Sequence, residues 1–430
     1  MPCVVFRSFR RFTVNLRCLL VLAVAGACGA VPLSGSAAEP LRLQDAIARA
    51  MAGNPTLVAE QAQLQAIQAR AQREALPTPY TVGGDLENVV GTGALSGLKS
   101  AETTLRIGRV LELGGKRQAR ESLGAAEIDQ QQNQAESARI ALASRTAERF
   151  IEVIADQHRL AFAQDRVKQA ERTRREVATW VKAARNPESD LRAAEIAVAE
   201  AELEREHAEH ELLSARMTLA SSWGSLDPDF GEALGNFDAL PAVEPFESLA
   251  SKLPMTPEQR ASLFEARTIE ARRRVAEAAA KPDITVNLGV RRLDALDDQG
   301  LVLSVSMPLG NRKRSAYSVA EADAQLAALN ARRDAQRYER HQELFERYQE
   351  LGHARLEADS LRKSMIPKAE QAVAFTRRGF EAGNFSFLAL TQAQRTLFEL
   401  RERSTEALAR YHTLLVEVER LTAVAQDATP

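Results

Sequence analysis

The chain has 430 residues, a net charge of −2 and only 5% aromatic residues. The near balance of charge excludes the strong basic excess that nucleic-acid binding uses. Few aromatic side chains and many alanines favour thin, closely packed helical layers over a thick globular core.

Residues 1–38 are predicted to be an export signal. An apolar run at about 18–30 follows a segment rich in arginine, and Ser36-Ala-Ala38 offers a cleavage site. The basic residues that precede the apolar run are Arg7, Arg10, Arg11 and Arg17. Without them the chain keeps 52 basic and 58 acidic residues, so the mature protein is expected to be acidic.

All cysteines lie within the expected signal, at positions 3, 18 and 28. Cleavage after Ala38 would remove them, so we predict neither disulfides nor thiolate metal sites in the mature chain. An alternative concerns Cys28, because Ala25-Gly-Ala-Cys28 is a loose lipid-attachment motif. Cys28 is therefore a candidate for lipidation.

The first half is predicted to contain helix, two strands and a very long helix. Helical periodicity covers about 41–76, where prolines end it. Alternating residues indicate strands at about 81–90 and 102–111, on either side of a Gly-rich turn. Residues 116–183 contain no proline, which predicts a helix roughly 100 Å long.

The second half repeats this order. Strands are predicted at about 283–292 and 300–309, with cleaner alternation than in the first half. A second long helix is expected over about 312–379, and Pro367 should kink it or start a new segment.

The duplication defines the expected domain organisation. A linker at 224–256 joins two structural repeats, 39–223 and 257–424, and a disordered tail is expected at 425–430.

The helices that return after each long helix carry heptad repeats, which are typical of knobs-into-holes packing. Alanine in such a seam lets two helices approach closely. The second-half series is Leu390, Leu397, Ser404, Tyr411 and Val418. The first-half series is Ala194, Ala201, Ala208 and Ala215.

Four strands with one apolar face would expose a large apolar patch in a soluble domain. A lipid-facing barrel would explain the patch, and about ten residues per strand is enough to cross a membrane. Closed transmembrane barrels need at least about eight strands, so several copies must share one barrel. The alternative from the residues is a soluble, exported coiled-coil protein with a small sheet.

Several segments, taken in order, resemble the TolC family of outer membrane efflux proteins, and most closely its heavy-metal (cobalt-zinc-cadmium) branch. The first-half segments are Leu41-Arg-Leu-Gln-Asp-Ala-Ile-Ala-Arg-Ala50 with Asn54-Pro55, Leu111-Glu-Leu-Gly-Gly-Lys-Arg117 and Leu219-Ala-Ser-Ser-Trp-Gly224. The second-half segments are Pro282-Asp-Ile-Thr-Val286, Pro308-Leu-Gly310 and Ala382-Gly-Asn-Phe-Ser-Phe-Leu388.

The resemblance implies a mainly α fold with a small β part. Four strands per protomer would form a shared trimeric transmembrane β-barrel, and coiled-coil-like helices would form a periplasmic α-barrel. It also implies a homotrimer in the outer membrane lipid of a Gram-negative bacterium, with a periplasmic adaptor and an inner-membrane RND pump as partners.

The implied function is passive conduction of divalent heavy-metal cations from the pump to the exterior. No phosphate-binding loop or nucleophile motif is present in the sequence, so we predict no enzyme activity and no cofactor. Two alternatives remain: a duct of the same family for drugs or secreted protein, and a soluble periplasmic coiled-coil scaffold.

The two turns between long and return helices are candidate sites for a periplasmic gate and for adaptor contact, because charges at a constriction set ion selectivity. Gly383 is expected to supply a permissive backbone angle, whereas Asp190 could simply cap the return helix. The candidates are Arg185, Glu188, Asp190, Arg377, Arg378, Glu381, Gly383 and Asn384.

His207 and His210 lie three residues apart on an expected helix and could present two imidazoles to Zn²⁺. Glutamates surround them in the sequence, which favours an ordinary solvated helix face. We therefore predict no metal site.

Overall fold

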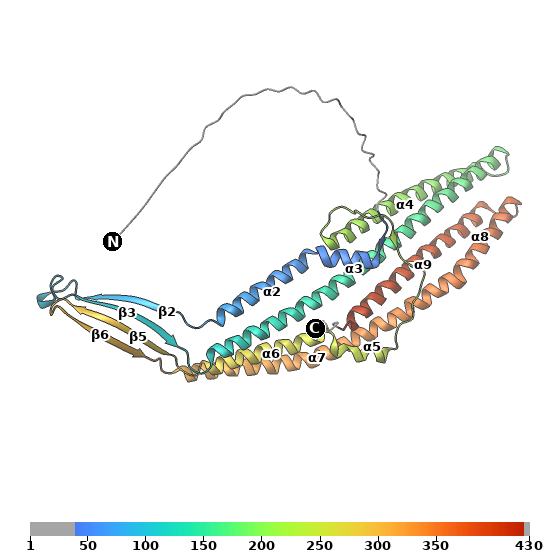
Figure 1. Cartoon of the computed structure of the whole chain (residues 1–430). Coiled ribbons are helices and arrows are strands. Elements are labelled where there is room, and N and C mark those ends of the chain that lie inside the picture. Colours follow the sequence, from blue (N-terminus) through green and yellow to red (C-terminus); the bar gives the residue numbers. More distant parts are fainter. Residues whose placement is uncertain (1–38, 425–430) are drawn as a thin grey trace, which may run out of the picture. The chain divides into compact units, whose positions relative to one another are not determined.

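A computed structural model of the chain describes residues 39–424, which belong to one compact unit. The expected export signal, the candidate lipidation site at Cys28 and the tail at 425–430 lie outside the described residues. The described part is mainly helical with a small sheet, as the sequence predicted. The sheet lies at one end of the long helices, and two helical hairpins lie at the other (Figure 1).

The same order of elements occurs in both halves. The first half contains β1 (Leu41–Arg42), α1 (Leu43–Gly53), α2 (Pro55–Glu74), β2 (Tyr80–Glu87), β3 (Glu102–Leu111), α3 (Lys116–Lys182) and α4 (Glu188–Ala220). The second half contains β4 (Ala233–Leu234), α5 (Phe246–Lys252), α6 (Pro257–Ala278), β5 (Ile284–Leu293), β6 (Asp298–Ser306), α7 (Asn311–Ser360), α8 (Ile366–Glu381) and α9 (Phe387–Thr422).

One antiparallel sheet unites the two strand pairs in the order β2-β3-β5-β6. The β3–β5 pairing, with Ile107 opposite Leu288, joins the two halves of the chain. Two strands end earlier than the sequence indicated. β2 stops at Glu87 because Asn88 has a positive φ of 58°, and β6 stops before Pro308, which has no N–H to donate.

The long helix α3 has 67 residues, which corresponds to roughly 100 Å. Its counterpart α7 continues through Gly352 and passes into a π-helical turn at Leu361–Met365, after which α8 begins. Pro367 occupies the first turn of α8, directly after the π turn, and has no N–H to donate within the helix. The expected new segment at this proline is therefore present, and a π turn precedes it.

The heptad seams are buried as the sequence predicted. In α9 all members of the series from Leu390 to Val418 are buried, and Tyr411 is completely so. In α4 Ala194, Ala201 and Ala208 are buried, and the last member of the series, Ala215, is partly buried. Each fully buried large apolar side chain contributes about 1.5–3 kcal/mol to folding, so these seams stabilise the pairing of return helices with long helices.

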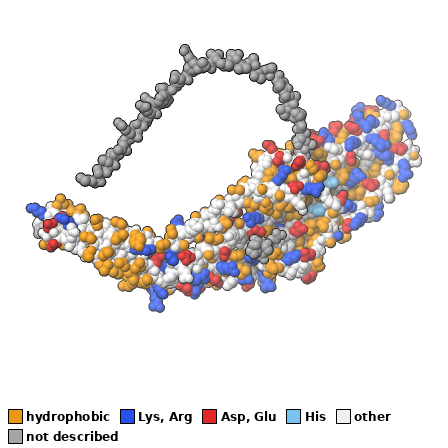
Figure 2. Space-filling view, viewed as in Figure 1, with side chains coloured by type: hydrophobic (Ala, Val, Ile, Leu, Met, Phe, Trp, Pro, Cys, Tyr) orange, Lys and Arg blue, Asp and Glu red, His pale blue; other side chains and the backbone are white. Residues whose placement is uncertain are grey.

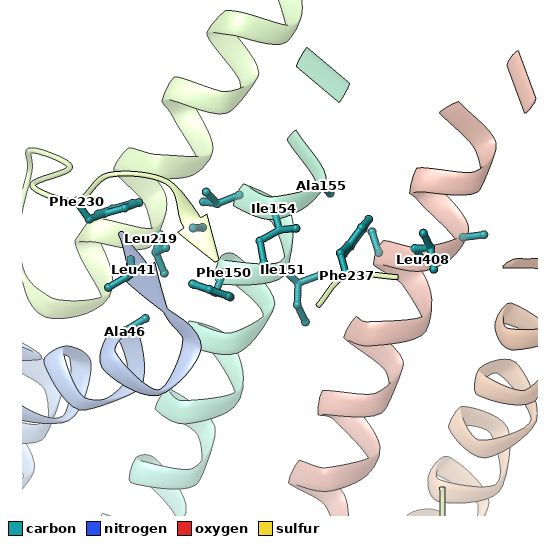
Figure 3. Packing of buried hydrophobic residues seen from close by; sticks show 14 of the residues in the cluster. Leu41, Ala46, Phe150, Ile151, Ile154, Ala155, Leu219, Phe230, Phe237 and Leu408 are labelled. Atoms are coloured by element: carbon teal, nitrogen blue, oxygen red, sulfur yellow. The ribbon is translucent and has the colours of Figure 1, made fainter. Parts of the chain in front are cut away.

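The linker at 224–256 inserts an aromatic side chain between the two halves. Phe237 lies between α3 and α9 (Figure 3). His158 and His412 stack on its ring, with centroid distances of 5.1 and 5.6 Å. Phe237 of the linker therefore fills the space between α3 and α9 and packs against both helices.

A short parallel pairing, β1 with β4, was not expected from the sequence. The side chain of Gln157 on α3 reinforces it, since its Oε1 accepts the Ala233 N–H at 2.8 Å and its Nε2 donates to the Ala233 carbonyl at 3.0 Å. This pairing attaches the start of the chain to the linker.

Candidate functional site

The four-stranded sheet has two chemically different faces. Side chains alternate across a strand, so the pairing register assigns each residue to one face. The apolar face carries large exposed side chains, such as Val82 at 81% and Leu301 at 82% exposure. Figure 2 shows hydrophobic side chains gathered over the sheet. The apolar face consists of Tyr80, Val82, Leu86, Leu105, Ile107, Leu111, Ile284, Val286, Leu288, Val290, Leu301, Leu303 and Val305.

Two arginines lie near the ends of the apolar face. Arg109 donates to the Thr78 carbonyl at 3.0 Å and lies over the Tyr80 ring, 4.8 Å from its centroid. At the other end Arg292 pairs with Asp294 and Asp297, each at 2.9 Å. Charged and aromatic groups thus bound the apolar band, as at a membrane–water interface.

The opposite face, the polar face, contains a charged network. Arg291 reaches Glu102 at 3.0 Å and Glu87 at 3.3 Å, and its Nε donates to the Thr104 hydroxyl at 3.0 Å. A second pair joins Arg106 to Asp85 at 2.8 Å. These contacts cross strand boundaries and suit a surface in contact with water and ions.

The polar face has an acidic excess within the described strands. Its carboxylates, Asp85, Glu87, Glu102 and Asp298, outnumber its two guanidiniums, those of Arg106 and Arg291. Arg291 was not assigned to the polar face from the sequence. The period-two pattern of a strand could have done so, because the neighbours Arg291 and Arg292 must lie on opposite faces of the sheet.

The four-stranded sheet has two free edges. β2 and β6 each have a single neighbour among the described strands, so each presents an unpaired row of backbone N–H and C=O groups.

At the opposite end of the helices lies the first hairpin tip, between α3 and α4. Arg185 lies over the Trp180 ring at 5.8 Å, and Glu188 pairs with Arg192 at 2.9 Å. Asp190 accepts a hydrogen bond from the Asn186 side chain at 2.8 Å. The cap position of α4 belongs to Pro187, so the capping role considered for Asp190 was wrong.

The second tip, between α8 and α9, holds the other five candidates, and four of them are exposed. Gly383 has a φ of +77°, Glu381 is exposed, and the Asn384 N–H donates to the Gly379 carbonyl at 2.8 Å. Arg378 lies over the Phe375 ring at 4.9 Å.

Arg377 differs from the other candidates because it is largely buried. Its Nη1 lies 3.3 Å from Glu176 Oε2 on α3, with 14% of the Arg377 side chain exposed. Of the other candidates Asp190 is half-buried and the rest are exposed, whereas Arg377 forms an ion pair between the two hairpins.

His207 and His210 are exposed on α4 and face Glu211 and Glu206 of their own helix, at 3.2 and 3.8 Å. In the described part of the chain no three His, Cys, Asp or Glu side chains gather closely enough to hold a metal ion. Over residues 39–424, no helix has an apolar stretch long enough to cross a membrane.

One buried carboxyl group lies on α3 where α4 packs against it. Asp156 is 3% exposed and accepts a hydrogen bond from Arg159, which also binds Glu152 at 2.7 Å. Burial raises the pKa of Asp156 above its ordinary value, and the hydrogen bond from Arg159 offsets only part of that effect.

A two-faced sheet with two free edges continues into a helix roughly 100 Å long, and this is the fold of solved outer membrane channels. CusC superimposes with a TM-score of 0.75 at 13% identity, covering 90% of this chain and 94% of that one. No protein-family model matches the chain.

Two relatives identify the family. The cobalt-zinc-cadmium resistance protein CzcC of Cupriavidus metallidurans is 31% identical over 388 residues, 90% of each chain. The nickel-cobalt-cadmium resistance protein NccC of Alcaligenes xylosoxydans xylosoxydans is 24% identical, covering 75% of this chain and 72% of its own. The chain belongs to the TolC family of outer membrane efflux proteins.

Membership makes the chain an outer membrane channel of an efflux system. The family consists of channels and not of enzymes, which confirms the expectation of no enzymatic activity. The soluble scaffold considered from the sequence is therefore wrong.

Proposed function

We propose that three copies of this chain form a duct that passively conducts divalent heavy-metal cations through the outer membrane. A periplasmic adaptor and an inner-membrane RND pump would deliver the cations. The observation that carries this proposal is the four-stranded sheet, apolar on one face, polar on the other and unpaired at both edges.

Four strands are too few to enclose a lumen, since closed transmembrane barrels have at least about eight. The free edge of β6 in one copy can pair with the free edge of β2 in the next. Three copies would then close a twelve-stranded barrel without unsatisfied backbone groups in lipid. Their apolar faces would meet lipid, and their polar faces would line the lumen.

Two observations support a divalent metal cargo. The relatives are resistance proteins for cobalt, zinc, cadmium and nickel by name. The polar face also carries more carboxylates than guanidiniums, and rings of carboxylates favour cations in a pore. A duct for drugs or secreted protein is the competing cargo assignment within the family.

We assign the hairpin tips to the periplasmic gate and the adaptor contact. A groove near the tips lies between α3, α4 and α9, and its lining includes Ile196, Leu203 and Leu388, which are 61%, 66% and 74% exposed. Exposed apolar side chains in a groove favour a helical partner. Of the first-tip candidates, Asp190 lines this groove, and Arg185 and Glu188 belong to the same tip.

The domain organisation follows from the same assembly. The repeats at 39–223 and 257–424 would each give two strands and one helical hairpin to the duct. The linker at 224–256 would form part of a belt around the helices.

The first test measures assembly and conduction. The chain without residues 1–38 is purified in detergent, its mass is determined by light scattering, and it is reconstituted in a planar bilayer. We expect a trimer with cation-selective conductance. A monomer that stays dispersed in water without detergent would contradict the proposal.

The second test separates the cargoes. A strain lacking the gene is compared with its complemented strain for growth in zinc, cobalt and cadmium, and in a panel of organic drugs. Sensitivity to the metals is expected. Sensitivity to the drugs alone would reassign the cargo while leaving the duct intact.

A further inference from the structure

A basic cluster lies where the apolar face meets the helices. The segment after β6 carries Met307 and Leu309, which are 49% and 84% exposed, and α7 begins two residues later. Figure 2 shows Lys and Arg side chains projecting where the sheet meets the helices. We define the basic cluster as Arg312, Lys313 and Arg314, all of them exposed.

The three cations of the basic cluster have no ion-pair partner within residues 39–424. Three other cations at this end of the sheet, all at the start of α3, form ion pairs inside the chain. Those pairs are Lys116 with Asp283 at 2.7 Å, Arg120 with Glu112 at 2.6 Å and Arg117 with Glu121 at 3.3 Å. The chain thus supplies counter-charges on the α3 side of the sheet and leaves the α7 side positive.

A fourth exposed cation adds to this charge. The Ser315 hydroxyl donates to the Ala276 carbonyl at 2.6 Å, which fixes the first turn of α7 beside the end of α6. Lys281 lies three residues after the end of α6, is exposed and also has no ion-pair partner among the described residues.

Adjacent like charges repel one another, and cations in the first turn of a helix also oppose its dipole. No acidic residue occupies the first turn of α7 to offset this. Negative charge from outside the chain would offset both of these unfavourable interactions.

We propose that the basic cluster binds the phosphate headgroups of anionic phospholipids in the leaflet on the helix side of the membrane. This inference rests on the proposed duct, in which the apolar face meets lipid. A lipid satisfies both neighbouring surfaces, because its chains cover the exposed Leu309 while its phosphate meets the exposed cations that follow in the basic cluster. Tyr317 is 67% exposed on the same helix, where an interfacial aromatic belongs.

The effect should be large enough to measure. A basic residue close to an anionic lipid surface strengthens binding by roughly fivefold, so three residues give about a 100-fold preference at low salt. The preference should weaken at high ionic strength, because screening shortens the reach of exposed charges.

The test uses the full assembly in detergent and native mass spectrometry with dioleoyl phosphatidylglycerol and dioleoyl phosphatidylcholine as probes. The wild-type protein should retain the anionic lipid at least tenfold better than the zwitterionic lipid. R312Q/K313Q/R314Q should lose that preference, and R312K/R314K should keep it. Inorganic phosphate is added in a parallel titration and should not displace the lipid.

A matched control lies on the same helix. Arg332, Arg333 and Arg337 are exposed and have no ion-pair partner in the described part of the chain. They begin about 30 Å further along α7. R332Q/R333Q/R337Q removes the same charge and should leave lipid preference unchanged.

The inference is overturned if R312Q/K313Q/R314Q retains the preference, or if the control variant loses it equally. It is also overturned if the wild-type protein shows no preference for the anionic lipid. That measurement needs no variant, so a misfolded variant cannot affect it. If inorganic phosphate displaced the lipid, the basic cluster would be a site for a free anion, and the lipid proposal would be overturned. Trimer mass and conductance in phosphatidylcholine bilayers are recorded alongside, so a failed duct is distinguished from a failed lipid site.

Discussion

The guanidinium of Arg377 on α8 lies 3.3 Å from the carboxylate of Glu176 on α3, and this ion pair joins the two helical hairpins near their tips. Both side chains are largely shielded, with 14% and 25% exposed. Glu176 also accepts a hydrogen bond from Arg172 of its own helix at 2.9 Å. The carboxylate therefore has one partner within its hairpin and one across to the other hairpin.

We expect R377Q to increase the open probability of the duct, because it removes the contact between hairpins. A partly shielded ion pair of this kind contributes about 1 kcal/mol, which corresponds to roughly fivefold in an opening equilibrium. Single-channel recording measures the change. R172Q removes the other partner of Glu176 without crossing hairpins and should leave opening unchanged, so equal effects of the two substitutions would refute the idea.

A second prediction concerns ion selectivity. Asp298 and Gln299 are neighbours at the start of β6 but lie on opposite faces of the sheet. D298K places a cation on the polar face and should shift the reversal potential toward anions, because wall charge sets selectivity in a pore. Q299K makes a positive substitution on the apolar face and should have little effect. The assignment of faces is wrong if the two substitutions shift the reversal potential alike.

A third prediction follows from Asp156, whose pKa is raised chiefly by burial. A raised pKa means that the folded state binds the proton more tightly than the unfolded state. The stability that protonation provides is present below the ordinary pKa of 3.8 and is lost as pH rises through the raised value. Charged Asp156 therefore lowers stability at neutral pH.

D156N should gain thermal stability relative to wild type as pH rises from acidic to neutral, and its own pH dependence should be flatter. Thermal unfolding in detergent across that range measures the difference. Asn can still accept the hydrogen bond from Arg159, so that contact is retained. D165N changes an exposed carboxylate on the same helix and should follow wild type at every pH. A gap between D156N and wild type that is independent of pH would contradict the assignment.

Features with a local pattern could be predicted from the sequence, and contacts between distant elements could not. The heptads of α9 placed Leu390 and Tyr411 in the seam because burial repeats with the helix period. The alternation of β5 likewise assigned Val286 and Leu288 to one face. These predictions need no knowledge of the partner element.

The ion pair of Arg377 illustrates the other case. Its partner Glu176 is 201 residues away, and both lie in ordinary charged helical stretches, so no local signal joins them. The β1–β4 pairing was missed for a similar reason, since two residues are too short to show alternation. The π turn before Pro367 touches the linker, since Arg362 donates to the Asp238 carbonyl at 2.7 Å, and that contact also spans residues far apart in the sequence.

The last prediction tests the backbone at the second tip. Gly383 has a φ of +77°, and a Cβ added there would meet no atom within 4 Å. Any penalty must therefore come from the backbone conformation, which costs L-residues about 1–2 kcal/mol and Asn less than Val. We expect G383V to impair efflux while G383N stays close to wild type, both measured as metal resistance in the complemented deletion strain.

Gly352 on α7 provides the matched control, because it also has open space around it but has a helical backbone. G352A should be neutral or stabilising by up to about 1 kcal/mol. Export of the precursor is checked for every variant by the amount of processed protein in the outer membrane fraction. If G383V and G383N conferred equal resistance, the positive φ of Gly383 would have no part in tip function, and the second tip would have to act through its side chains.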